Sequence, residues 1–169
     1  MRVIPPNSFG MAFGTVGLAG TWLAAADTGL APRAVGDALL AVAAALWAVV
    51  LAAYAVHVGA HRGTLRSDLA HPVLAPFVSL AVITPMVLAA RGVAPWAPTL
   101  GAVLVDVFLA ATVLHGAWFT GQLIAGEYAI DQMHPGYFLP TVAGGLVASA
   151  SAAEVGQHGL GTAMFGYGM

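Results

Sequence analysis

The chain has 169 residues, of which 60% are hydrophobic and only 7% are charged, and its formal net charge is −2. A soluble domain carries about 25% charged residues, so this composition predicts a membrane protein. These residues include no cysteine, no lysine and no basic cluster, which argues against thiol chemistry, a lysine Schiff base or nucleic acid as a partner. We expect no enzymatic activity, no cofactor and no metal.

Five apolar runs follow one another along the chain. A membrane-crossing helix needs about 20 residues and a membrane strand only about 10, and four of the runs have the helical length. We therefore predict an all-α membrane protein with about five full transmembrane helices, plus the start of a sixth after His158. The runs cover approximately residues 9–26, 38–60, 73–90, 96–122 and 137–153.

A proline precedes every second run, at Pro6, Pro72 and Pro135, which are roughly 65 residues apart. A unit of that length holds one helical hairpin. We predict a single transmembrane domain over residues 1–169, made of hairpin repeats at about 6–71, 72–134 and 135–169. The last repeat is incomplete, and we interpret the chain as an N-terminal portion of a longer transporter.

The first run of each repeat lacks ionisable residues and contains glycine or proline instead, as at Gly14, Pro85 and Gly144. Proline frees a backbone carbonyl, which is best tolerated beside protein or a wet cavity. Carboxylates usually line cation paths. Runs that offer only hydroxyls and bent backbone therefore favour a path for anions. An ordinary small-residue packing face is the alternative explanation of the glycines.

Three residues of the second runs are ionisable groups at membrane depth and could take part in coupling or ligand binding. Asp106 is either a coupling or gating carboxylate or a partner in a hydrogen bond between helices. His57 and His115 are candidate haem ligands, or they are hydrogen-bonded histidines without a ligand. Arginines at 2, 62 and 66, against 33 and 91 on the other side, weakly favour a cytoplasmic N-terminus.

The proline-led segments carry a resemblance to a known family. IPPNSFGMAFGTVGLAGTW, AHPVLAPFVSLAVITPMVLAA and MHPGYFLPTVAGGLVASASAAEVG resemble the tellurite-resistance/C4-dicarboxylate transporters, which include slow anion channels and a malic acid transporter. The last segment is the most specific. The resemblance implies ten helices in five hairpins around a central pore, with odd helices inside and even helices outside, and a trimer. The phenylalanine that plugs the pore in this family lies on the ninth helix, which this chain does not contain.

We therefore expect a multi-pass anion channel or transporter of the plasma membrane, which moves malate-like dicarboxylates or other small anions through the lipid bilayer. The alternatives are a membrane haem-binding redox subunit and a non-transporting assembly or truncated protein. The candidate pore-lining residues are Phe9, Phe13, Gly14, Phe77, Thr84, Pro85, Phe138, Pro140, Thr141 and Gly144.

Overall fold

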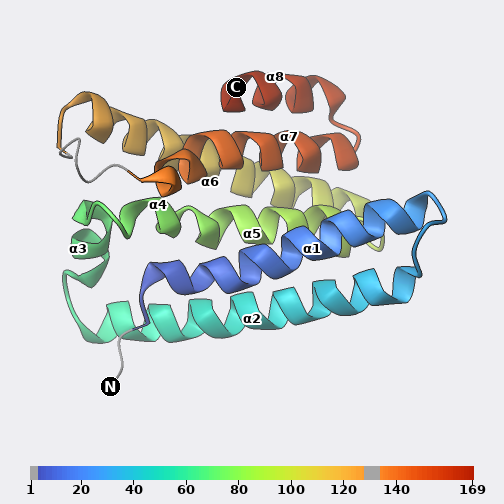
Figure 1. The fold of residues 1–169 in the computed structure, drawn as a ribbon, viewed down its shortest axis with the longest axis horizontal. Coiled ribbons are helices and arrows are strands. Elements are labelled where there is room, and N and C mark those ends of the chain that lie inside the picture. Colours follow the sequence, from blue (N-terminus) through green and yellow to red (C-terminus); the bar gives the residue numbers. More distant parts are fainter. Residues whose placement is uncertain (1–3, 128–133) are drawn as a thin grey trace.

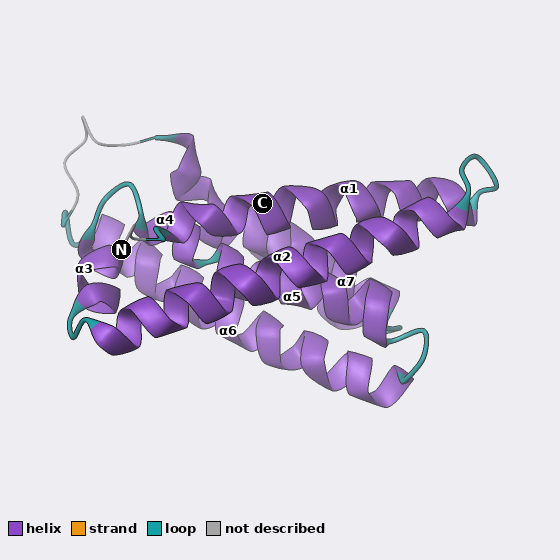
Figure 2. Cartoon of the chain, turned by 90° about the horizontal axis from the view of Figure 1, so that it is seen from below, coloured by secondary structure: helices purple, strands orange, loops and turns teal. Residues whose placement is uncertain are grey.

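The computed structural model describes residues 4–127 and 134–169, whose regular structure is entirely helical (Figure 2). Arg2, which entered the orientation argument, lies outside the described residues. The α-helices are α1 (Phe9–Asp27), α2 (Arg33–Ala60), α3 (Thr64–Ala70), α4 (Ala75–Val78), α5 (Leu80–Leu88), α6 (Pro98–Ile124), α7 (Gly144–Glu154) and α8 (His158–Gly168). The 3₁₀ turns are η1 (Pro6–Ser8) and η4 (Pro135–Phe138), and the π-helical turns are η2 (Ala89–Val93) and η5 (Leu139–Ala143).

Four helical segments within the described residues are long and apolar enough to cross a membrane: Pro6–Asp27, Arg33–Ala60, Ala75–Val93 and Pro98–Ile124. The chain is therefore a multi-pass α-helical membrane protein. The run predicted as a fifth crossing is helical from Pro135 to Glu154 but is not among these four. A fifth full crossing and the start of a sixth stay predictions.

Two helix boundaries differ from those expected from composition. The helix α2 begins at Arg33, five residues before the apolar run, because charged residues in a first turn can face water while the backbone is already helical. The polar connection before Pro72 contains the short helix α3. The Tyr54 hydroxyl donates a 2.7 Å hydrogen bond to Asp68 Oδ2, which holds α3 against the end of α2.

The long helices form hairpins that lie side by side (Figure 1). The helix α1 packs along α2, α5 along α6, and α7 along α8. The segment Ala75–Val93 contacts helices of all these hairpins and is the most enclosed span, with 50% of its window buried against 22–28% for the other three. It therefore forms the centre of the bundle, between α1 on one side and α7 on the other.

Candidate functional site

A groove of about 370 Å³ lies between α1, the α5–η2 segment and α7. These are the segments that begin the predicted repeats, and within the described residues no side chain of α2, α6 or α8 lines it. Alternate segments of the chain thus share one concave surface. The lining residues are Val16, Gly17, Gly20, Thr21, Ala24, Val87, Ala90, Arg91, Val147, Ala150, Ser151 and Glu154.

The α1 wall of the groove carries two glycines, Gly17 and Gly20, beside Val16, Thr21 and Ala24. Gly10, Gly14, Gly17 and Gly20 follow one another at helical spacing, and a Cβ atom built on any of them would meet nothing within 4 Å. Another face of α1 is packed, with Ala19 and Leu23 completely buried. The glycines of α1 therefore leave space open in this chain, and they do not bring α1 into close contact with α2.

Helix α5, which contributes Val87 to the groove, contains a proline whose unpaired carbonyl is bonded by a side chain of α2. Pro85 has no N–H to bond the carbonyl of Ala81, four residues earlier in α5. The indole Nε1 of Trp47 in α2 donates a 2.9 Å hydrogen bond to that carbonyl. A freed carbonyl at membrane depth needs such a donor. Sequence reasoning missed Trp47, although an indole within a run of Ala, Leu and Val was a usable signal.

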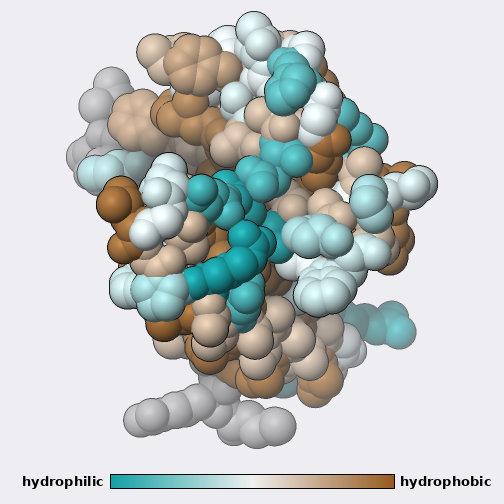
Figure 3. Space-filling view, turned by 90° about the vertical axis from the view of Figure 1, so that its right-hand side faces the viewer, coloured by the Kyte–Doolittle hydropathy of each residue, from teal (hydrophilic) through white to brown (hydrophobic). Residues whose placement is uncertain are grey.

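One end of the groove is closed by an ion-pair network. The π turn η2 carries Arg91, whose Nη1 lies 3.0 Å from Asp27 Oδ2 at the end of α1 and whose Nη2 lies 2.9 Å from Glu154 Oε2 at the end of α7. Arg33 adds a 2.8 Å contact with Asp27 Oδ1. Figure 3 looks at this end of the bundle and shows hydrophilic residues across its middle, with hydrophobic surface around them. One guanidinium thus connects the ends of both walls.

Several predicted pore residues lie in the packed interior of this chain. Phe9 is 1% exposed and packs edge-on against Tyr54 of α2, with ring centroids 5.9 Å apart. Thr84 and Pro85 are buried in α5, and the Thr84 hydroxyl has no hydrogen-bond partner. A Cβ on Gly144 would lie 2.7 Å from Thr112 Cγ2, so this glycine permits close approach of α7 to α6.

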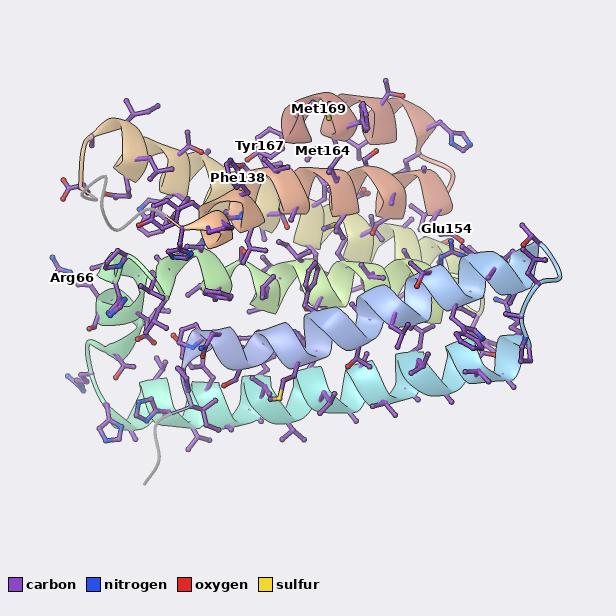
Figure 4. The ribbon with its side chains drawn as sticks, in the orientation of Figure 1. Arg66, Phe138, Glu154, Met164, Tyr167 and Met169 are labelled. Atoms are coloured by element: carbon purple, nitrogen blue, oxygen red, sulfur yellow. The ribbon has the colours of Figure 1, made fainter. Side chains whose placement is uncertain are left out.

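The remaining pore candidates divide between the groove side and a second hollow. Gly14 belongs to the open face of α1, and Phe13 is half-buried beside it. Phe138 and Thr141 line a separate cavity of about 510 Å³ against α6, where Phe138 is 65% exposed (Figure 4). Phe77 is half-buried and stacks on His134, and Pro140 is buried at the start of η5. These residues lie on the first segments of the predicted repeats, and their role in a pore stays a prediction.

The titratable residues of the second runs lie away from the groove. Asp106 is exposed on α6 and accepts a 3.1 Å hydrogen bond from Gln157 Nε2. The ring centroid of His57 lies 4.6 Å from that of His61, just beyond the end of α2, and the centroid of His115 lies 5.6 Å from that of Trp118. Among residues 4–127 and 134–169 no group of three His, Asp or Glu side chains could hold a metal ion. The coupling role of Asp106 stays a prediction.

The fold and the groove define a class: a multi-pass helical membrane protein whose alternate segments share a common concave surface. Comparison with known families identifies the member of that class. A family model described as voltage-dependent anion channel matches residues 3–169, so the chain belongs to this family. The resemblance that the proline-led segments predicted is confirmed.

The chain is also similar to the tellurite resistance protein TehA homolog of Haemophilus influenzae. The two are 30% identical over 106 residues. The matched stretch is 62% of this chain and 32% of that protein, so it spans only about a third of the relative's length.

Proposed function

We propose that this chain forms part of a transmembrane path for small anions, including malate-like dicarboxylates, in the plasma membrane. The observation that carries the proposal is the groove between α1, α5–η2 and α7, which within the described residues is lined only by the segments that begin the predicted repeats. Family membership supports an anion as the moving species. Movement along such a path requires no covalent chemistry.

The lining of the groove suits weak contact with an anion. Most lining side chains are small and apolar, and Thr21 and Ser151 add hydroxyls. The one lining carboxylate is Glu154, which is paired with Arg91 at the groove end. The volume of about 370 Å³ falls within the range of about 300–1,000 Å³ that is usual for small-molecule sites. An anion there meets little repulsion and no strong trap.

The outer helices supply the surface that such a path needs toward lipid. Large apolar side chains project from α2 and α6, where Val49 is 67% and Leu114 is 71% exposed. Hydrophobic surface of this kind is stable against acyl chains or a second membrane protein. We accordingly place α2 and α6 outside the path, toward lipid and toward neighbouring copies in a trimer. The predicted hairpin repeats and the ten-helix whole protein complete the proposal.

The direct test is anion flux from liposomes that contain the purified full-length protein. We expect gradients of malate or chloride to dissipate faster than in empty liposomes, while a potassium gradient is retained. Folded protein that gives no anion flux would contradict the proposal and favour a non-transporting assembly role. Soret absorbance of the purified protein would instead favour the haem-binding alternative.

A further inference from the structure

The charged end of the groove contains a cation that is already bound by carboxylates of its own chain. Arg91 is 22% exposed, lines the groove, and contacts Asp27 and Glu154 through different nitrogens of its guanidinium. Guanidinium groups recognise carboxylates through a planar fork of N–H donors. The same geometry that holds Glu154 can therefore hold the carboxylate of a solute at this position.

The two internal carboxylates differ in how firmly they are held. Asp27 is shared with Arg33, so it has a second cation beside it. Within the described residues Glu154 forms its ion pair with Arg91, and its side chain is 35% exposed at the end of α7. Figure 4 shows Glu154 at this end of the bundle and Arg66 at the opposite end. Glu154 is the carboxylate that an entering anion displaces at lower cost.

We propose that Arg91 is the docking group for solute carboxylates at this end of the path, and that Glu154 is an internal competitor for the same guanidinium. The inference rests on the proposed anion path, and it deepens that proposal by naming a carboxylate site. An arginine would otherwise hold an anion too firmly for conduction. When the Glu154 carboxylate binds the Arg91 guanidinium again, the solute is released.

A docking site and a purely structural clamp predict opposite behaviour of two variants. Arg91→Gln removes the docking group, so malate binding weakens. Glu154→Gln removes the competitor, so malate binding tightens by about two- to fivefold, the range expected for one partly exposed ion pair. A clamp that only fixes the positions of α1 and α7 would be broken by either substitution, and both variants would then change in the same direction.

The experiment measures malate binding to the purified full-length protein by the rise of its melting temperature with malate concentration, which needs no flux. Arg66→Gln is the matched control, because Arg66 lies at the opposite end of the bundle and does not line the groove. The carboxylate site is supported if the malate affinity falls in Arg91→Gln, rises in Glu154→Gln and is unchanged in Arg66→Gln. Shifts of the same sign, or none, overturn it.

Flux from liposomes carrying the same variants separates this inference from the proposed function. Opposite shifts in binding without any wild-type flux would retain the carboxylate site and reject the transmembrane path. Wild-type flux together with binding shifts of the same sign would retain the path and reject docking at Arg91.

Discussion

The two walls of the groove contain glycine for different reasons. On α1, Gly14 and Gly17 face open space, and a side chain at either position would contact nothing within 4 Å. On α7, a Cβ at Gly145 would lie 2.7 Å from the Cα of Gly168 in α8, and one at Gly144 would lie equally close to Thr112 in α6. The glycines of α1 keep space empty, whereas those of α7 let three helices pack closely. Predictions for the two walls therefore separate conduction from stability.

The largest expected effect is on the α7 wall. Gly145→Leu forces its side chain into the backbone of α8, and such overpacking costs about 1–3 kcal/mol or more. We expect a much lower melting temperature and a loss of monodisperse protein in size-exclusion chromatography. Wild-type melting of this variant would mean that α7 and α8 are not packed as described.

The α1 wall should show the reverse behaviour. Gly17→Leu adds a side chain to the groove lining at a position where the Cβ meets nothing within 4 Å, so we expect anion flux to fall about tenfold or more while the melting temperature stays near that of wild type. Gly121→Leu is the matched control, because Gly121 also has open space around it but lies on α6. Equal flux from both leucine variants would show that the α1 face does not line a path.

The hydrogen bond between α2 and α5 should give an intermediate effect. Trp47→Phe removes the donor to the Ala81 carbonyl and leaves that carbonyl unpaired, which costs about 1–3 kcal/mol. We expect a melting temperature several degrees lower. Trp22→Phe is the control, since the Trp22 indole bonds the carbonyl of Pro32 in an exposed connection where water can replace it. A larger loss at Trp22 would contradict the role given to Trp47.

The smallest effect belongs to the outer member of the ion-pair network. Arg33 pairs with Asp27, but both side chains are about half exposed, at 55% and 45%. Water and salt screen such a pair, and exposed pairs contribute little to stability. We expect Arg33→Gln to leave melting and flux unchanged within error. A strong loss of flux would assign to Arg33 the role that we give to Arg91.

The lengths of the apolar runs predicted the helical class, and the proline-led segments predicted the family. The spacing of the prolines picked out the three segments that share the groove. These patterns did not predict which residues of a segment face the groove. Phe9 and Gly144 were predicted to line a pore, and in this chain they pack against Tyr54 and Thr112, since side-chain direction depends on how neighbouring helices are rotated. Their role in a pore stays a prediction. Arg91 entered the sequence analysis only as one of the arginines of the orientation argument, and the fold is what places it between Asp27 and Glu154.

Sequence periodicity also fails to predict two hydrogen bonds between residues that are far apart in the chain. The bond from Trp47 to Ala81 joins positions 34 residues apart, and the bond from Gln157 to Asp106 joins positions 51 residues apart. Neither pair follows a helical or strand period, so only the packing of the hairpins reveals it. Pro85 indicated that a carbonyl would be free, but it did not indicate which side chain bonds it.

The central claim is that the groove between α1, α5–η2 and α7 is a water-filled path for anions, and thiol accessibility tests it most directly. The 169 residues contain no cysteine, so a thiol introduced here has no background from this part of the chain. We expect Gly17→Cys to react with a membrane-impermeant, negatively charged thiol reagent in liposomes, and the reaction to lower anion flux. Val49→Cys, on the outer surface of α2, should not react. Labelling of Val49→Cys with Gly17→Cys unreactive would contradict the account.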